Sequence, residues 1–438
     1  MFKQNIWLVI FTIFLCAFSI SAQISRIYSI SPNQAQTGAT AFPIVVKGSN
    51  FAKNSVVQVG GVNLETYFVS WNKLRAVVPA NLATTAGNLN LKVIKNGRTS
   101  NAVNLNISNS PVGNYEWTAL TAKLQSHVPA TVSGLTFMLS RHGKIIYSQA
   151  FGNQTVNTIL PIASATKMPS MTAILTLVDA GVLNLDTPIS VYLNGFVTVP
   201  ADKANLTMRM LMNHTSGLSG TADAGCLDDR MTTLRLCAQQ ILNLTLSYTP
   251  GTRFDYGGNS MQLAGYIAEV LAGESWNQFF ARKIGTPLGL TRFTYTNTQN
   301  PRVPGGAFSD VSDYTRILQM YLANGTFGNT RIISNQTYYE MQTDQRRGLT
   351  ALNNPGGNRL TKYSYGWWHS ADDYLQSQPA PTTPGLELSD QGAFGCTPWI
   401  DFEYNFTAII LVNSNVPTAT VIWNDIRPLI IAQMQNNP

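Results

Sequence analysis

The 438-residue chain is poor in charge, since only 12% of its residues are Asp, Glu, Lys or Arg. Its formal net charge of +7 is spread along the sequence without a basic block, which argues against a nucleic-acid partner. Histidine occurs four times, at 127, 142, 214 and 369, and never at metal-ligand spacing. We therefore expect no metal and no cofactor. The 44% hydrophobic content, at this length, provides for two or three domains with packed cores.

Cysteine is also scarce, with four residues in the whole chain. Cys16 lies inside an apolar N-terminal stretch. Cys226 and Cys237 are natural disulfide partners across a short loop in an oxidising compartment. Cys396 is then left over, and we expect a buried thiol without a catalytic role.

The N-terminus has the pattern of a secretory signal. Lys3 supplies a positive charge, residues 6–18 are almost entirely apolar, and small residues at 19–22 offer a cleavage point. We predict a signal peptide at 1–22 and a secreted or periplasmic protein. An uncleaved membrane anchor is the alternative, but the stretch is short for a membrane span.

Residues 24–107 are predicted to form a domain made only of β-strands. Polar and apolar residues alternate at 88–93, and Asn96-Gly97 then predicts a tight hairpin. About seven short strands fit this length, which favours a small β-sandwich. The segments ISP at 30–32 and VKGSNF at 46–51 resemble the immunoglobulin-like IPT/TIG family. The resemblance implies a spacer, which we favour, or a binding unit that contacts a surface or a carbohydrate.

A Pro- and Gly-containing linker is predicted at 108–114, and a second domain at 115–438. Residues 135–139 and 144–147 are typical of two strands joined by a turn at 142–143. Helical patterns follow to about residue 340. Strand patterns return at 392–401 and 406–412, and a last helix is expected from about Trp423. We therefore expect an α+β fold in which strands from both ends of the domain form one sheet, covered by the helical middle.

Ser164 and Lys167 lie one turn apart at the start of a predicted helix. A serine hydroxyl is a weak nucleophile until a neighbour accepts its proton, and a desolvated lysine can do so. The positive end of the helix favours a developing alkoxide. The spacing alone is weak evidence, because Ser70 and Lys73 repeat it in the β-domain without a helix.

Two later segments strengthen the interpretation of Ser164: PGTRFDYGGN at 250–259 and DQGAFG at 390–395. Together with SATK at 164–167, they resemble the serine β-lactamase and penicillin-binding-protein superfamily, and class C β-lactamases and related esterases most closely. GVLNLDTP at 181–188 and LMNHTSGL at 211–218 extend the resemblance, which runs from about residue 115 to the C-terminus. It implies an antiparallel sheet flanked by helices with an all-helical subdomain.

The resemblance also implies catalytic roles. Ser164 would be the acylated nucleophile, Lys167 would accept its proton or hold a neighbouring base in its charged form, and Tyr256 would act as base or proton relay. The backbone N–H groups of Ser164 and Ala393 would form the oxyanion hole. His214 would be a structural loop residue. The pattern Gly-x-Ser-x-Gly is absent, which further weakens an α/β-hydrolase interpretation.

Two positions depart from the family pattern, and with Gly392 they are the predicted substrate-binding residues. An asparagine usually stands two residues after the tyrosine, where this chain has Gly258, with Asn259 one residue later. A lysine or histidine usually stands at the position of Asp390. If Asp390 faces the substrate, it repels a carboxylate and favours neutral esters, or amides with a cationic end. Alternatively, Asp390 points away and makes a structural pair.

The function that we expect is an esterase-type serine hydrolase acting on a small-molecule or peptide-like ester or amide. A β-lactamase or D-amino-acid peptidase is the alternative within the same fold. The alternative of another class is a non-catalytic binding protein that retains the fold, with the β-domain as its targeting unit.

Overall fold

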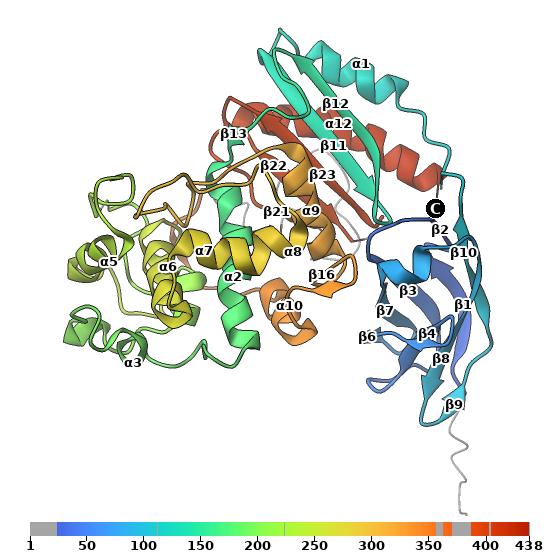
Figure 1. Ribbon diagram of the computed structural model, residues 1–438, viewed down its shortest axis with the longest axis horizontal. Helices are drawn as coiled ribbons and strands as arrows, with labels where there is room; N and C mark the ends of the chain where they lie inside the picture. The colour runs from blue at the N-terminus through green and yellow to red at the C-terminus, as the bar shows by residue number, and fades with distance from the viewer. Residues whose placement is uncertain are drawn as a thin grey trace, which may run out of the picture.

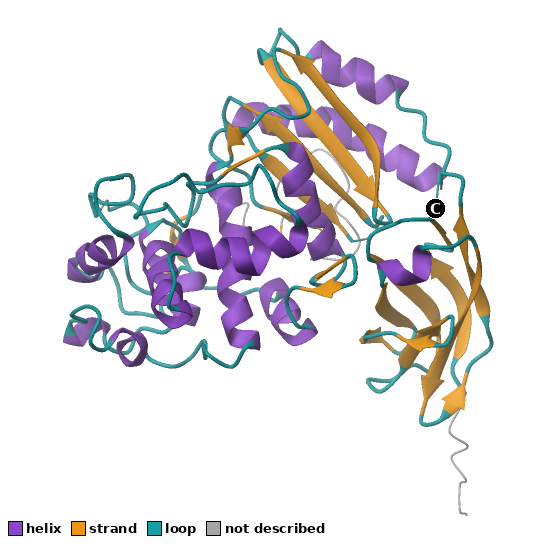
Figure 2. Ribbon diagram, in the orientation of Figure 1, coloured by secondary structure: helices purple, strands orange, loops and turns teal. Residues whose placement is uncertain are grey.

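The computed structural model describes residues 24–111, 113–222, 224–355, 362–369, 387–402 and 404–437. The predicted signal peptide at 1–22 lies outside the described residues. Figures 1 and 2 show a β-sandwich beside a larger body in which helices cover a sheet. The predicted α+β class is confirmed, and so is the β-domain that precedes it.

The β-sandwich contains ten short strands within the described residues 24–111, three more than expected. One sheet has the order β1-β3-β7-β6, and the other has the order β2-β10-β8-β4-β5 with β9 paired to β8. The predicted hairpin is present, since Lys95 pairs with Arg98 and Asn96 and Gly97 have φ of 50° and 74°. The extra strands are short pieces of two or three residues, too short for a sequence pattern. The strands are β1 (Arg26–Ser31), β2 (Gln34–Gln36), β3 (Phe42–Ser49), β4 (Val56–Val59), β5 (Val62–Asn63), β6 (Thr66–Ser70), β7 (Lys73–Val78), β8 (Gly87–Lys95), β9 (Arg98–Thr99) and β10 (Val103–Ser108).

The main sheet of the larger domain is antiparallel and has seven strands among the described residues, in the order β12-β11-β23-β22-β21-β20-β19. The pairing of β11 with β23 joins the two ends of the domain, with Leu135 opposite Val412. The expectation of one sheet from both ends is therefore confirmed. The strands are β11 (Gly134–Arg141), β12 (Lys144–Gly152), β19 (Tyr363–Ser364), β20 (Trp367–His369), β21 (Glu387–Ser389), β22 (Thr397–Asp401) and β23 (Phe406–Val412).

Helices cover both faces of this sheet (Figure 1). Alternate residues of β23 face opposite ways, as a strand requires. Phe406, Ala408 and Ile410 pack with α1 (Thr118–Ser126) and α12 (Val416–Asn436), whereas Ile409 and Leu411 pack with α2 (Lys167–Asp179) and α9 (Val311–Leu322). The last helix begins at Val416, seven residues before the expected start. Asn415 caps it by accepting a hydrogen bond from the Thr418 N–H.

The helical subdomain lies beside α2, away from the sandwich (Figure 1). In the described part of the chain, none of the helices combines the length and apolar character needed to cross a membrane. The remaining helices are η1 (Ala80–Ala83), η2 (Ala163–Thr166), α3 (Ile189–Leu193), η3 (Ala201–Lys203), α4 (Met208–Met212), α5 (Leu234–Asn243), α6 (Asn259–Ala272), α7 (Trp276–Phe280), η4 (Ala281–Gly285), α8 (Thr286–Leu288) and α10 (Asn335–Gln342). Short strands pair as β13 (Leu160–Pro161) with β15 (Phe308–Ser309), β14 (Phe254–Asp255) with β18 (Ala351–Asn353), and β16 (Thr326–Phe327) with β17 (Thr330–Arg331).

The β-sandwich packs directly against the larger domain. Tyr67 of β6 stacks on Tyr339 of α10 with ring centroids 3.8 Å apart, and Glu65 forms an ion pair with Arg331. Hydrogen bonds from backbone N–H groups add to this interface: Thr40 donates to the Gly143 carbonyl, Ala80 to the Gly328 carbonyl and Asn81 to the side-chain Oδ1 of Asn329. These contacts hold the sandwich against the domain that carries Ser164.

The stacked tyrosines offer a test of this interface. We expect Tyr67→Ala to lower the free energy of unfolding by about 1 kcal/mol, because the change removes an aromatic pair. Urea denaturation measures the change. Tyr28→Ala is the matched control, since Tyr28 is 63% exposed on the same sandwich. If the two substitutions lowered the free energy of unfolding equally, the stack of Tyr67 on Tyr339 would not stabilise the protein as predicted.

Candidate active site

Ser164 lies in the 3₁₀ turn η2, immediately before α2. The residue before it, Ala163, has φ of +45°, a conformation that is strained for a residue with a side chain. Ser164 is half-buried, whereas its neighbours Ala163 and Ala165 are buried. Its Oγ accepts a hydrogen bond of 3.0 Å from Lys167 Nζ. The structure therefore brings the predicted nucleophile and the predicted proton acceptor together.

Lys167 is almost fully buried, with 4% of its surface exposed. Its Nζ also donates to the Pro304 carbonyl at 2.9 Å and lies 4.6 Å from the ring centroid of Tyr256. Burial lowers the pKa of Lys167 to about 8, with Asp390 acting against the lowering and Arg302 adding to it. Near neutral pH a minor fraction of this amine is therefore uncharged and able to accept a proton, and that fraction grows as pH rises toward 8.

Tyr256 is held in place by its own backbone. Its N–H donates to the Asn353 carbonyl at 3.1 Å, and its carbonyl accepts from Asn353 Nδ2. The following Gly257 packs against Gly220, where an added Cβ would lie only 2.3 Å from the Gly220 Cα. A side chain at 257 would displace this loop. Glycine is therefore required for the close approach.

Aromatic residues surround Tyr256 and include His214. The ring centroids of His214 and Tyr256 are 4.8 Å apart, and His214 Nε2 is 3.2 Å from the Tyr363 hydroxyl. Burial, with a smaller effect from Lys167, holds the pKa of His214 well below its usual value. His214 is fully buried and has no hydrogen bond to Ser164. These contacts suit a neutral packing residue, in line with the structural role expected from the resemblance.

Two backbone donors are available for an oxyanion. Neither the Ser164 N–H nor the Ala393 N–H is hydrogen-bonded to an acceptor within the described residues. Ala393 lies in an exposed turn between β21 and β22. The strand expected from Gly392 begins only at Thr397, so Ala393 is outside it. The turn touches the segment before the nucleophile, since a Cβ on Gly392 would lie 2.0 Å from the Ile162 carbonyl oxygen. The predicted oxyanion hole stays a prediction that this placement supports.

Asp390 follows β21 and is completely buried. Neither of its carboxylate oxygens has a hydrogen-bond partner within the described residues. Burial raises the pKa of Asp390 well above its usual value, and the charge of Lys167 opposes part of the increase. Asp390 therefore has no access to solvent, and the structural pair considered as an alternative is also missing among the described residues. Its substrate-binding role stays a prediction.

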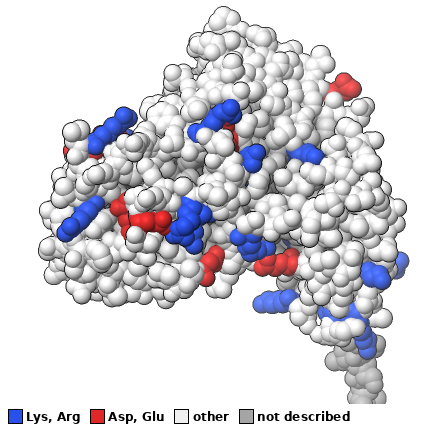
Figure 3. Space-filling model, in the orientation of Figure 1, with Lys and Arg blue, Asp and Glu red and all other residues white. Residues whose placement is uncertain are grey.

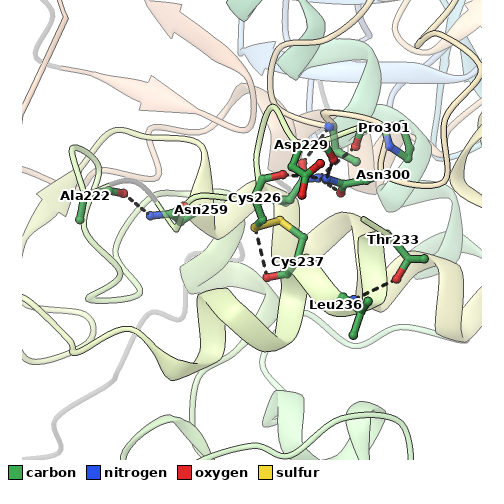
Figure 4. Close-up of a disulfide and its surroundings, with 11 residues drawn as sticks. Ala222, Cys226, Asp229, Thr233, Leu236, Cys237, Asn259, Asn300 and Pro301 are labelled. Carbon is green, nitrogen blue, oxygen red and sulfur yellow. Dashed lines mark hydrogen bonds between the residues drawn. A yellow bond between two sulfur atoms is a disulfide. The ribbon is translucent and has the colours of Figure 1, made fainter. Parts of the chain in front are cut away.

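Asn259 begins α6 and points toward a neighbouring loop (Figure 4). Its Nδ2 donates to the carbonyls of Ser219 and Ala222, at 3.0 and 2.8 Å. Both amide hydrogens are thus used within the protein. The predicted contact between Asn259 and substrate is untested, and the observed bonds give this residue a role in holding the loop.

The loop at 302–307 lies outside the sequence motifs and also contributes to the site. It runs along the nucleophile segment, where the Ile162 N–H donates to the Ala307 carbonyl and the Ala307 N–H donates to Thr166 Oγ1. Its most direct contribution is the Pro304 carbonyl that accepts from Lys167. A backbone carbonyl has no side-chain signature, so only the Gly305-Gly306 pair marked this loop as a turn.

The predicted disulfide is confirmed, since Cys226 and Cys237 are bonded with Cα atoms 5.3 Å apart. Cys396 is a buried free thiol, as expected. Asn300 Nδ2 donates to the carbonyls of Cys226 and Asp229, at 2.7 and 2.9 Å, and so fixes the loop that the disulfide closes (Figure 4).

The antiparallel sheet, the helical subdomain and the serine bonded to a buried lysine define a class of protein, that of the active-site serine hydrolases. The family profile described as Beta-lactamase matches residues 122–429, and that of the IPT/TIG domain matches residues 25–109. The chain therefore belongs to the beta-lactamase family and carries an IPT/TIG domain.

Individual relatives agree with this assignment. Penicillin-binding protein 4 of Amycolatopsis lactamdurans is 34% identical over 31% of this chain and 36% of its own length. The crystal structure of a candidate beta-lactamase from Bacteroides dorei is 27% identical, with a TM-score of 0.63 over 72% of this chain and 99% of that one. EstCE1, a hydrolase with promiscuous acyltransferase activity, shares the fold at 17% identity, with a TM-score of 0.58 over 70% and 98% of the two chains. The chain spans between a third and a half of the length of the first curated relatives that it matches.

The disulfide gives a prediction for stability. We expect the double substitution of Cys226 and Cys237 by serine to lower the free energy of unfolding by about 3 kcal/mol, the loop-closure contribution of a loop of this length. Urea unfolding with and without dithiothreitol measures it. The reductant should destabilise the wild type and leave the double variant unchanged. A wild type that is insensitive to full reduction would contradict the prediction.

Proposed function

We propose that this protein hydrolyses small carboxylic esters through an acyl-enzyme on Ser164. The observation that supports the proposal most directly is the 3.0 Å hydrogen bond between Ser164 Oγ and the buried Lys167. Uncharged Lys167 takes the proton of Ser164 as Oγ attacks the ester carbonyl. The Ser164 and Ala393 N–H groups stabilise the negative oxygen of the tetrahedral intermediate.

Breakdown of the intermediate requires a proton for the leaving alcohol. In this proposal the Tyr256 hydroxyl relays that proton from Lys167, whose amine lies 4.6 Å from the centroid of the Tyr256 ring. Expulsion of the alcohol leaves the acyl group on Ser164 Oγ and restores uncharged Lys167. Water then attacks the acyl carbonyl, gives its proton to the same basic groups, and releases the carboxylic acid and free Ser164.

Esters are preferred over β-lactams in this proposal because position 390 lacks the cation that the family pattern uses to bind a β-lactam carboxylate. The family pattern has a cation at this position, whereas this chain has a fully buried acid. The likeness to EstCE1 supports acyl transfer by this fold. The similarity to penicillin-binding protein 4 favours the second candidate, a β-lactamase or D-amino-acid peptidase. A chromogenic ester assayed beside a chromogenic cephalosporin separates the two candidates, and turnover of the cephalosporin alone would reverse their order.

We further propose that the protein is secreted or periplasmic. The apolar N-terminal pattern at 6–18 and the Cys226–Cys237 disulfide support this location, since disulfides persist in oxidising compartments. On the face shown in Figure 3, charged side chains are sparse and the two signs are mixed, with no large area of one charge. The IPT/TIG domain supports a contact with a protein or a surface, and the domain interface leaves much of the sandwich available for it.

Labelling of the nucleophile tests the catalytic proposal against a non-catalytic binding protein. We expect a fluorophosphonate probe to label the wild type and to leave Ser164→Ala unlabelled, because only an activated serine reacts. Ser70→Ala is the matched control, since Ser70 precedes Lys73 at the same spacing in the sandwich. Labelling is read by in-gel fluorescence. The proposal would be contradicted if Ser164→Ala were still labelled, or if the wild type were not labelled.

The pH dependence of ester hydrolysis tests the role of Lys167. Because the amine must be uncharged, we expect kcat/KM to rise as pH increases and to level off above an apparent pKa near 8. A pH profile with 4-nitrophenyl butyrate, corrected for spontaneous hydrolysis, measures it. A rate that is already level from pH 6 would exclude Lys167 as the proton acceptor.

Asp390→Asn gives a matched variant for this profile. The carboxylate raises the pKa of Lys167, so its removal is expected to move the rising limb to lower pH. If the rising part of the pH profile does not move, Asp390 has no electrostatic effect on the pKa of Lys167.

A further inference from the structure

A pocket of about 180 Å³ lies beside the nucleophile. Pro161 and Gly305 form part of its wall. Pro161 precedes Ser164 by three residues, and a Cβ on Gly305 would lie 3.7 Å from the carbonyl of Ala163. The pocket therefore adjoins the segment that positions the attacking oxygen.

Two other lining residues lie close to Ala393 and Tyr256, the remaining groups of the candidate active site. Phe394 follows Ala393, the predicted oxyanion residue, and is 46% exposed. Leu227 adjoins the segment after Tyr256, since a Cβ on Gly258 would lie 2.9 Å from its Cδ1. The pocket therefore adjoins the segments that carry Ser164, Tyr256 and Ala393.

The charged residues that line the pocket come from the loop closed by the Cys226–Cys237 disulfide and from the loop at 302–307. Arg230 and Arg302 are cationic, and Asp228 is anionic. Arg302 Nη1 lies 2.5 Å from Asp228 Oδ1, while its Nε has no hydrogen-bond partner among the described residues. The side chain of Arg302 is 42% exposed and so is accessible from the pocket. The three charges leave the pocket net positive; the Nε of Arg302 is itself buried, so the exposed remainder of its side chain is what faces outward.

The loop that carries Asp228 and Arg230 is built to hold a fixed shape. The disulfide closes it, and Asn300 binds two of its carbonyls (Figure 4). Asn300 Oδ1 in turn accepts a hydrogen bond of 2.9 Å from Gln262 of α6. These contacts hold the backbone of this wall, from which the exposed side chains of Asp228 and Arg230 extend.

We propose that this pocket binds a carboxylate on the acyl part of the substrate, with Arg302 as the residue that determines this specificity. The inference rests on the proposed ester hydrolysis and names its substrate class as monoesters of dicarboxylic acids. Guanidinium groups bind carboxylates through paired, charge-assisted hydrogen bonds. The expectation of a neutral or cationic substrate depended on Asp390 facing it, and Asp390 is buried and does not line the pocket.

A pair of chromogenic esters tests the proposal: the 4-nitrophenyl monoester of adipic acid and 4-nitrophenyl hexanoate, which have acyl chains of the same length. The readout is the ratio of their kcat/KM values. We expect the wild type to favour the adipate ester and Arg302→Gln to lower the ratio about tenfold, the size of one charge-assisted hydrogen bond. High salt should also lower the wild-type ratio.

Two further variants make the result specific. Asp228→Asn removes the acid that competes for Arg302, so we expect a higher ratio, and Asp228 is 77% exposed, which favours normal folding. Arg282→Gln is the matched control: Arg282 also forms an ion pair, with Glu274, but does not line the pocket. Its ratio should equal that of the wild type. A ratio that neither Arg302→Gln nor Asp228→Asn changes would overturn the proposal.

Binding to Ser164→Ala, measured by calorimetry with the monoethyl ester of adipic acid and with ethyl hexanoate, separates the two proposals. Preferential binding of the adipate ester without hydrolysis by the wild type would overturn the proposed function and keep the pocket assignment. Hydrolysis of hexanoate with no preference in either measurement would overturn the pocket assignment alone.

Discussion

The burial of one ammonium group is the constraint on which the candidate active site depends. Moving an unpaired charge out of water costs several kcal/mol, so Lys167 needs partners within the protein. Ser164 Oγ and the Pro304 carbonyl accept its hydrogens, and the ring of Tyr256 faces the charge. The same burial lowers the pKa of Lys167 to about 8. The feature that is costly for stability is therefore the one that makes the amine a usable base.

This constraint explains why distant segments converge on one point. Pro304 comes from a loop that is also hydrogen-bonded to the nucleophile turn, and Tyr256 directly follows β14, the short strand paired with β18. His214 and Tyr363 pack around Tyr256 and fix the orientation of its ring. The loop at 302–307 and the residue after β14 thus supply groups that compensate the charge, while η2 and α2 supply the serine and the lysine.

Much of this could be predicted from the sequence, because it depends on side chains in short motifs. Ser164, Lys167 and Tyr256 were found in that way, and the structure places them together. The single sheet from both ends of the domain followed from strand patterns of clear period. The Cys226–Cys237 disulfide followed from the short loop between the two residues and the scarcity of cysteine.

Other features depend on backbone groups or on packing between distant segments, which have no local pattern. Examples are the Pro304 carbonyl that accepts from Lys167 and the two hydrogen bonds between Asn353 and the backbone of Tyr256. The early start of α12 depends on the cap at Asn415, but the apolar periodicity is clear only from about Trp423. The stack of Tyr67 on a distant helix is equally invisible, because nothing in β6 indicates its partner.

The position of Asp390 shows most clearly what the fold adds to the motif. In the sequence, an acid at a position that is usually cationic suggested repulsion of the substrate. In the structure, that acid is buried and acts on Lys167, raising its pKa, while Arg302 acts in the opposite direction from the pocket side. A carboxylate bound at Arg302 would offset the positive charge there and so weaken one of the two effects that lower the pKa of Lys167, the larger of which is burial. Substrate charge and the proton affinity of Lys167 are therefore coupled through a loop that the motif does not contain.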